Sequence, residues 1–116
     1  MFENVAGMKC LVTGGAGFIG SNLIKLLLEN KCIVSVLDNL FSGFRENLES
    51  FPNIQFIHGD IRDARLVKDA MDGIDVVFHQ ASSVGNSRSI ENPVRDSEIN
   101  VIGTLNILEA AKERQV

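Results

Sequence analysis

Short apolar runs of strand length recur along this chain and alternate with stretches of helical periodicity. The runs at 9–13, 32–37, 54–58 and 74–79 are rich in Val, Ile, Leu and Phe, and each ends at glycine or polar residues. The run CIVSVL at 32–37 is typical of a strand buried on both faces of a parallel sheet. The pattern therefore predicts four strands.

Two helices are predicted between these strands. The first follows the glycines at 14–20, and its apolar face is expected to hold Ile19, Leu23, Leu26 and Leu27. The second is expected at 64–71, between a capping Asp63 and a terminating Gly73. Its shared face is predicted to consist of Leu66, Val67, Ala70 and Met71.

A third helix is predicted to begin at Pro93 and to run toward the end of the chain. Its inner side is expected to carry Ile99, Ile102, Leu105, Asn106, Leu108 and Ala110. Residues 39–53 have loop composition with one helical turn near 44–48, and 80–92 predict a long polar loop. Residues 1–7 are expected to be a lead-in that the fold does not need.

This order of elements predicts an α/β fold in a single domain over residues 1–116. Strands that alternate with helices favour a parallel sheet covered on both faces. Right-handed crossovers place the strands in the order 3-2-1-4. The chain stops after the fourth strand and its helix, so the expected three-layer sheet is truncated before a fifth strand.

Composition excludes several classes of function. With 45% hydrophobic residues, the 116-residue chain has enough apolar side chains for a core. The net charge of -4 without a basic cluster argues against nucleic acid or an anionic membrane as partner. No membrane span or signal peptide is evident, which predicts a cytoplasmic protein. Cys10 and Cys32 are expected to be buried free thiols, and no metal site is predicted.

Three glycines between the first strand and the first helix are spaced G-x-x-G-x-x-G. Gly14 permits a sharp turn, Gly17 permits close approach of a pyrophosphate, and Gly20 permits tight packing of the helix on the strand. The free N–H groups at the start of the helix then face the anion. A tight turn that binds nothing is the alternative, and a P-loop is excluded because no Gly-Lys-Ser/Thr follows.

An acidic residue, Asp38, follows the second strand at the position expected for a ribose-binding carboxylate. An ionised carboxylate accepts two hydroxyl hydrogen bonds and repels a 2′-phosphate, which favours NAD over NADP. A turn-forming aspartate is the alternative role. Arg45 is interpreted as an exposed loop arginine rather than a ligand of that phosphate.

Five motifs in a fixed order resemble the extended short-chain dehydrogenase/reductase family, in particular its NAD-dependent nucleotide-sugar epimerases and dehydratases. They are TGGAGFIGSNL at 13–23, LDNLFSG at 37–43, GDIRD at 59–63, HQAS at 79–82 and NVIGTLNILEAA at 100–111. UDP-hexose 4-epimerases are the most similar group, through DNLFSG and SRSIENP, and a dTDP- or GDP-sugar dehydratase stays open. The resemblance implies a Rossmann-type domain that binds NAD.

The resemblance also implies a set of cofactor-binding residues. It places Phe18 and Ile19 over the pyrophosphate, Asp60 and Ile61 beside the adenine, and residues 80–82 at the nicotinamide ribose. Simpler roles remain open, namely a strand-end turn for Asp60 and a solvated helix residue for Asn100. The implied set is Gly14, Gly17, Phe18, Ile19, Gly20, Asp38, Asn39, Ser42, Gly43, Asp60, Ile61, Gln80, Ala81, Ser82 and Asn100.

Four other polar residues and one arginine-containing loop position are not included in this cofactor-binding set. His79 and His58 are interpreted as structural, because neither corresponds to the family's base. Ser83, Ser87 and Arg88 either face a sugar nucleotide or belong to a serine-rich loop.

The family's redox step uses a Tyr-x-x-x-Lys pair, and this sequence contains no tyrosine. The resemblance therefore implies the cofactor-binding part of an epimerase or dehydratase without its catalytic and substrate-binding part, inactive alone. A UDP-sugar is the implied substrate of the full-length parent. The alternative is a stand-alone, non-catalytic dinucleotide-binding module. The bare fourth strand is expected to promote self-association.

Overall fold

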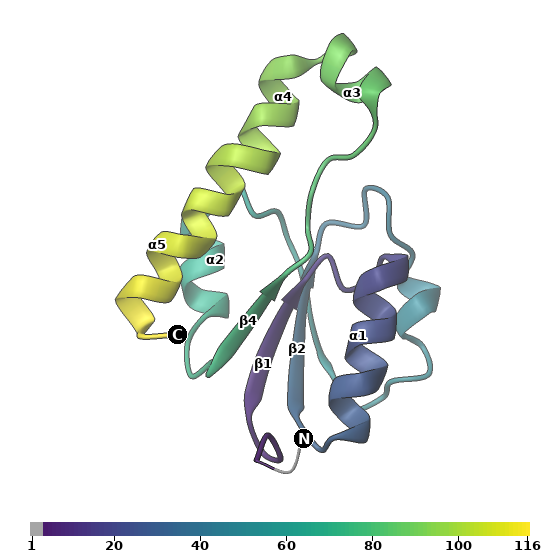
Figure 1. Ribbon diagram of the computed structural model, residues 1–116, viewed down its shortest axis with the longest axis vertical. Coiled ribbons are helices and arrows are strands. Elements are labelled where there is room, and N and C mark those ends of the chain that lie inside the picture. Colours follow the sequence, from purple (N-terminus) through teal and green to yellow (C-terminus); the bar gives the residue numbers. More distant parts are fainter. Residues whose placement is uncertain (1–3) are drawn as a thin grey trace.

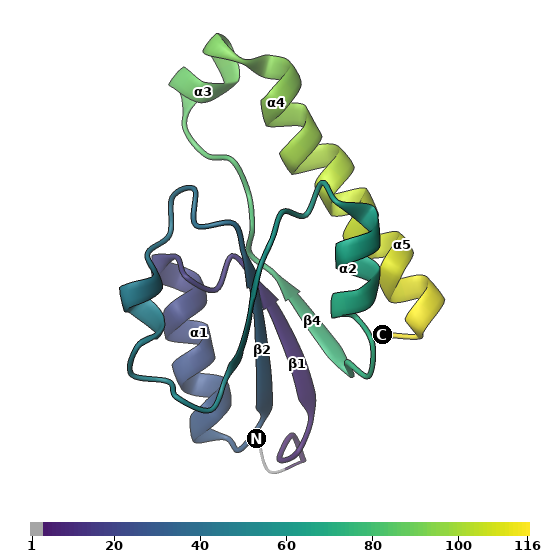
Figure 2. The same ribbon diagram turned by 180° about the vertical axis from the view of Figure 1, so that it is seen from behind.

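The computed structural model describes residues 4–116, which form one sheet flanked by helices (Figures 1 and 2). The strands are β1 (Lys9–Thr13), β2 (Ile33–Asp38), β3 (Gln55–His58) and β4 (Val76–His79). The helices are α1 (Phe18–Glu29), η1 (Arg45–Leu48), α2 (Ala64–Ala70), α3 (Asn86–Glu91), α4 (Pro93–Ser97), the π-helical η2 (Glu98–Gly103) and α5 (Thr104–Arg114).

The sheet is parallel and has the strand order β3-β2-β1-β4, so the predicted order 3-2-1-4 is confirmed. Helix α1 and η1 cover one face, and α2 and α5 cover the other (Figure 1). Successive residues of β1 pack into hydrophobic cores on opposite faces of the sheet. Cys10 and Val12 pack toward α1, whereas Leu11 packs toward α2 and α5. All three are at most 2% exposed, as expected for a central strand with both faces covered.

Other local predictions are also confirmed. Asp63 caps α2, since its side chain accepts a hydrogen bond from the Leu66 N–H at 3.1 Å. Gly73 follows that helix with a positive φ of 73°. Cys10 and Cys32 are buried free thiols, and burial, followed by the neighbouring Cys32, raises the pKa of Cys10 to about 11. No helix within residues 4–116 combines the length and apolarity that crossing a membrane requires.

The apolar face predicted for α1 is wrong at two positions. Ile24 is fully buried against the sheet, with Leu23 and Leu27 beside it, whereas Leu26 is 45% and Ile19 67% exposed. The first turn of the helix extends past the carboxyl end of the sheet, so the Ile19 side chain has no core to enter. Likewise β2 is not buried throughout, because Ile33 at its start is 53% exposed.

The last helix is not one continuous α-helix, and its predicted inner side is partly wrong. The π-helical turn at 98–103 separates α4 from α5. The inner side consists of Ile99, Gly103, Ile107 and Ala110, and Asn106 also faces inward and donates to the Ile61 carbonyl at 2.9 Å. Ile102, Leu105 and Leu108 are exposed instead. Gly103 has no apolar side chain, so the pattern of apolar residues did not place it on the inner side. A Cβ at this position would meet the Ile61 side chain at 2.5 Å.

Two segments, a predicted loop and a lead-in that the fold was expected not to need, contribute more structure than predicted. Residues 86–91, inside the predicted polar loop, form the short helix α3, which has too few apolar residues to show periodicity. Within the predicted lead-in, Val5 packs against the core and the Gly7 N–H donates to the Lys31 carbonyl at 2.9 Å. Positions 1–3 of that lead-in lie outside the described residues.

A buried hydroxyl fixes the backbone that follows β4. Thr13, at the end of β1, is fully buried, and its Oγ1 accepts hydrogen bonds from the N–H groups of Gln80 at 3.0 Å and Ala81 at 3.1 Å. A hydroxyl has two acceptor lone pairs and one proton, so Oγ1 donates its proton to Nδ1 of His79 at 2.7 Å. His79 Nδ1 is therefore unprotonated in this arrangement.

The opposite ring nitrogen of His79 ties the sheet to the last helix. Nε2 lies 3.0 Å from Oγ1 of Thr104, which itself donates to the Asn100 carbonyl at 2.7 Å. The Nε2–H therefore donates to Thr104, and His79 is a neutral imidazole with a structural role. Burial lowers the pKa of His79, in agreement with this hydrogen-bond pattern.

These bonds predict a loss of stability in mild acid. Because the pKa of His79 is lowered in the folded state, the unfolded chain takes up a proton first as pH falls through about 6.5. We expect His79→Gln to cost about 1–3 kcal/mol at pH 7.5 and to flatten the decline in stability toward pH 5.5. Urea unfolding at both pH values measures this.

His58→Gln is the matched control for that measurement. Its ring is exposed and lies 3.2 Å from the Asn39 carbonyl, far from the buried network of Thr13 and Thr104. We expect this variant to keep the decline of the unmodified chain. A His79→Gln chain that loses as much stability between pH 7.5 and 5.5 as the unmodified chain would contradict the assignment.

Candidate functional site

A cavity of about 350 Å³ lies at the carboxyl ends of the parallel strands. The segments that follow β1, β2, β3 and β4 all contribute to its lining, and the first turn of α1 forms one side. Because loops after parallel strands meet at the same sheet edge, ligands of open α/β sheets bind at this position. The arm formed by α3 and α4 extends beyond the same edge (Figure 1).

The glycine turn after β1 brings two backbone segments into direct contact. Gly14 has a φ of 68°, and its N–H donates to the Leu37 carbonyl at 2.8 Å. A Cβ on Gly14 would lie 2.7 Å from the backbone nitrogen of Ala81, so only glycine fits at this position. Gly20 is required for a related reason, since its Cβ would run into the carbonyl oxygen of Gly14.

Helix α1 begins at this turn, and none of its own side chains neutralises its amino end. Its N-cap, Gly17, provides no side chain, and the first turn contains no acidic residue. The first N–H groups of a helix have no intrahelical carbonyl partner and carry the positive end of the helix dipole. Gly17, Phe18, Ile19 and Gly20 line the cavity, so this amino end is suited to a phosphate or another anion.

Asp38, at the end of β2, lies in the cavity wall and is 8% exposed. Its Oδ2 accepts the Ala16 N–H at 2.9 Å, and its Oδ1 accepts the Leu40 N–H at 2.7 Å. These bonds fix the carboxylate between the glycine turn and the loop after β2. Each oxygen uses one of its two acceptor sites, so the carboxylate is still able to accept two hydroxyl groups.

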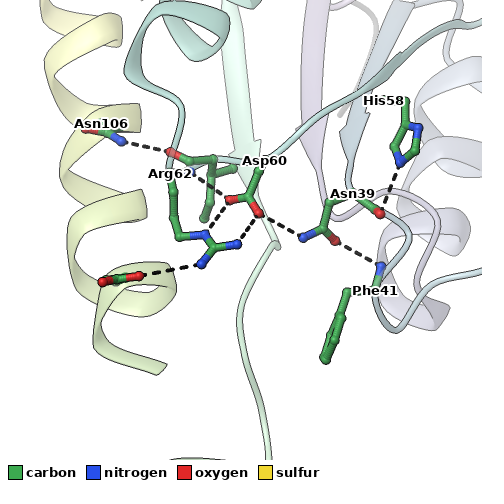
Figure 3. Close-up of polar contacts among 8 residues, drawn as sticks. Asn39, Phe41, His58, Asp60, Arg62 and Asn106 are labelled. Atoms are coloured by element: carbon green, nitrogen blue, oxygen red, sulfur yellow. Dashed lines mark hydrogen bonds and ion pairs between the residues drawn. The ribbon is translucent and has the colours of Figure 1, made fainter. Parts of the chain in front are cut away.

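Asp60, just after β3, is the centre of a second hydrogen-bonded group (Figure 3). Its carboxylate accepts three hydrogen bonds from Arg62 at 2.8–3.0 Å and one from the Asn39 amide at 3.2 Å. The hydrogen bonds from the Arg62 side chain lower the pKa of Asp60 to about 2. Since four donors occupy the two oxygens, an adenine amine has to compete with them for Asp60.

Asn39 joins this group to the loop after β2. Its side-chain oxygen accepts the Phe41 N–H at 3.0 Å, while its amide donates to Asp60 (Figure 3). Arg62 also lies 3.5 Å from the carboxylate of Glu98 on η2. The loops after β2 and β3 and the last helix are thus held together by side chains beside the cavity.

All but one of the cofactor-binding residues implied by the sequence line this cavity. They are Gly14, Gly17, Phe18, Ile19, Gly20, Asp38, Asn39, Ser42, Gly43, Asp60, Ile61, Gln80, Ala81 and Ser82. Asn100 stands behind the wall, where it accepts the Ser83 N–H at 2.7 Å and donates to the Ser83 carbonyl at 2.9 Å. It therefore fixes the loop after β4, which is a supporting position.

The cavity also includes residues that sequence reasoning did not select as ligands. They are Leu37, Phe41, Gly59, Val84 and Ile99, and Ser83, for which the sequence offered a place facing a sugar nucleotide, lines the cavity as well. Phe41 lies inside the motif at 37–43, and this motif was the only feature of the sequence that could have pointed to it. The side chain of phenylalanine has no polar group that would mark it as a ligand. Arg88 lines a smaller neighbouring cavity, and Arg45 lies over the Phe56 ring instead, at 4.8 Å. Within residues 4–116, no cluster of His, Cys, Asp or Glu is arranged to hold a metal ion.

Solved structures share the arrangement of these elements. An epimerase from Methanothermobacter thermautotrophicus superposes with a TM-score of 0.92 at 39% identity, over 97% of this chain and 34% of that one. The UDP-glucose 4-epimerase of Thermus thermophilus, solved with NAD, gives a TM-score of 0.86 at 43% identity, over 94% and 35% of the two chains.

Sequence comparison gives the same family. The CDP-paratose 2-epimerase of Salmonella typhi is 46% identical over 114 residues, which are 91% of this chain and 33% of the relative. This chain spans about a third of the length of such relatives. The model of the NAD dependent epimerase/dehydratase family matches residues 10–116 and confirms the resemblance drawn from the motifs. The chain belongs to the NAD dependent epimerase/dehydratase family.

Proposed function

We propose that this chain is the NAD-binding portion of a nucleotide-sugar epimerase or dehydratase and is most like UDP-hexose 4-epimerases. The observation that carries the proposal is the cavity at the carboxyl ends of the strands. It combines an amino end of α1 that none of the helix's own side chains neutralises, the buried carboxylate of Asp38 and the loop at 80–82. These three groups suit a pyrophosphate, a ribose diol and a second ribose, respectively.

The proposed cofactor is NAD rather than NADP. Asp38 is held by two backbone N–H groups, so it cannot swing away from a ribose that enters the cavity. A fixed carboxylate accepts the 2′- and 3′-hydroxyls but repels a 2′-phosphate. Arg45, the nearby cation in sequence, lies over the Phe56 ring and does not line the cavity.

The proposal separates cofactor binding from chemistry. The sequence contains no tyrosine, and the family's acid/base tyrosine therefore has no counterpart in it. His79 does not replace it, because its two ring nitrogens are occupied by Thr13 and Thr104. When bound, NAD supplies the hydride chemistry, and the residues of this chain bind and orient it. A UDP-sugar is the proposed substrate of the parent enzyme.

The second candidate is a stand-alone dinucleotide-binding module without a reaction of its own, which needs no tyrosine. The two candidates differ in what the genome encodes next. A reading frame that continues into a strand ending in Ser-Ser and then Tyr-x-x-x-Lys supports the epimerase portion. A frame that ends at Val116 favours the module.

Self-association through the edge of β4 stays a prediction. β4 pairs only with β1 in the described sheet, so its other edge has unpaired N–H and C=O groups. Its residues are each half-buried by α5 and the neighbouring loops.

We expect the purified chain to bind NAD at least about tenfold more tightly than NADP in calorimetry. Asp38→Asn removes the charge that repels the 2′-phosphate, so the ratio of the two affinities should fall by about tenfold, or 1.4 kcal/mol. Asp69→Asn, an exposed carboxylate on α2 outside the cavity, is the matched control and should leave the ratio unchanged. Equal or tighter binding of NADP by the unmodified chain would refute the role of Asp38.

Two glycine variants should separate binding from folding. Gly17 has φ and ψ values open to any residue, and its Cβ would meet only the Gly14 carbonyl oxygen, at 3.3 Å. We expect Gly17→Ala to fold with a cost below about 1 kcal/mol while its methyl group lowers NAD affinity about tenfold or more. Gly20→Ala should instead lose about 1–3 kcal/mol of stability, because its Cβ meets backbone.

Thermal melting and NAD calorimetry on both variants measure the two effects. If Gly17→Ala binds NAD as tightly as the unmodified chain does, the pyrophosphate does not lie at the amino end of α1.

We also expect no interconversion of UDP-glucose and UDP-galactose by the purified chain with saturating NAD. The reason is the missing acid/base tyrosine. Coupled detection of product over hours measures the rate. A rate above the no-protein blank that persists through purification, and that Asp38→Asn reduces, would contradict this expectation.

A further inference from the structure

Two arginines of the α3–α4 arm, residues 86–97, stand over one aromatic ring of the loop after β2. The Arg95 guanidinium carbon lies 4.2 Å from the centre of the Phe41 ring, and that of Arg88 lies 5.0 Å from it. Both distances are within the range of cation–π attraction. The three residues come from segments about fifty positions apart in sequence, so their contact joins the arm to the loop after β2.

Phe41 stands between two cavities. It lines the dinucleotide cavity described above, and it also lines a smaller one of about 280 Å³ together with Arg88 and Arg95. Its backbone is fixed by the N–H bond to Asn39, while its ring extends away from the Asp60 group (Figure 3). Phe41 is 54% exposed, and the guanidinium groups of Arg88 and Arg95 lie over its ring.

The arm has few other means of holding this position. Neither α3 nor α4 contains a buried residue, and Gly85, just before α3, has a φ of 107° with open space around it. Neither Arg88 nor Arg95 forms an ion pair with a carboxylate among residues 4–116. Nη1 of Arg88 is buried without a hydrogen-bond partner in the described part of the chain. The Phe41 ring is thus the attractive partner that these two cations share.

We propose that Arg88 and Arg95 are positioning residues that hold the Phe41 ring at the mouth of the dinucleotide cavity and thereby slow the release of bound NAD. This inference rests on the proposed function, because it takes NAD as the occupant of the cavity. Asn39, Ser42 and Gly43, which line the cavity, belong to the same loop as Phe41. A ring held by the arm keeps that loop in place over the ligand, and a released ring lets the loop move away.

The expected effect is kinetic. An exposed cation–π contact corresponds to a factor of about two to five, so loss of both contacts should speed NAD release about fivefold or more. The association rate should change less than twofold, since the binding groups of the cavity are untouched. Lysine in place of each arginine keeps a positive charge over the ring, so the double lysine variant should still release NAD slowly.

The first measurement that tests the proposal uses no ligand. The sequence contains no tryptophan and no tyrosine, so Phe41→Trp gives a chain with a single indole. We expect acrylamide to quench this indole at least about twofold more efficiently after Arg88→Gln and Arg95→Gln. Unchanged quenching would overturn the claim that the arginines hold the ring, whether or not NAD binds.

The second measurement uses the chain with Phe41 unchanged. Bound NADH is displaced by excess NAD in a stopped-flow instrument, and its own emission reports release. The Arg88→Gln, Arg95→Gln double variant should release NADH about fivefold faster, and the corresponding double lysine variant should release it at nearly the original rate. Equal release from the double glutamine variant and the unmodified chain overturns the proposal, as does a lysine variant no slower than the glutamine variant.

Arg45→Gln is the matched control, because it removes a similar cation–π contact, to Phe56 at 4.8 Å, outside the dinucleotide cavity. It should leave NADH release unchanged, and an equal acceleration by this variant overturns the proposal. If the unmodified chain binds neither NADH nor NAD, the proposed function fails, and the acrylamide measurement alone decides whether the arginines hold the ring.

Discussion

The close backbone contact between the turn after β1 and the loop after β4 is the constraint on which the cavity depends. Gly14 and Ala81 approach so closely that no Cβ fits between them, and the hydroxyl of Thr13 binds the N–H groups of the same loop. The two loops leave neighbouring strands at the same sheet edge, so fixing one against the other fixes the wall of the cavity. The amino end of α1 then opens into a space whose shape is already set.

The electrostatics of the cavity follow from how its carboxylates are held. An anion that enters at the amino end of α1 meets two aspartates nearby, and free carboxylates there would repel it. Asp38 instead accepts two backbone N–H groups, and Asp60 is paired with Arg62, which lowers its pKa to about 2. The Asp38 carboxylate is thereby tied to the glycine turn and to the loop after β2, and the Asp60 carboxylate is tied to Arg62. Hydrogen bonding to backbone and to arginine lets one cavity offer a positive end for phosphate and a negative end for hydroxyls.

Much of the fold and of the cavity was predictable because it depends on local chemistry. Strand length, the spacing of the three glycines and the capping position of Asp63 are each readable within a few residues. The order 3-2-1-4 follows from the handedness of crossovers, which holds for nearly all parallel sheets.

The errors lie where tertiary packing decides. Ile19 and Leu26 were assigned to a buried face, although α1 extends beyond the sheet at one end and faces solvent along that side. The π-helical turn at 98–103 and the use of Gly103 against Ile61 have no signal in apolar periodicity. The Phe41 ring lies under two arginines some fifty residues away, a contact that no local pattern reveals.

The groups around the cavity also differ in what holds them. Apart from Ile99 on η2, the groups that line the cavity come from the ends of the four strands, from the loops that follow them, or from the helix that follows β1. The imidazole at the end of β4, that of His79, is a neutral bridge between Thr13 and Thr104 and so has a structural role. Hydrogen bonds that involve Thr13, Asp38 and Asn100 hold the backbone of the cavity wall in place.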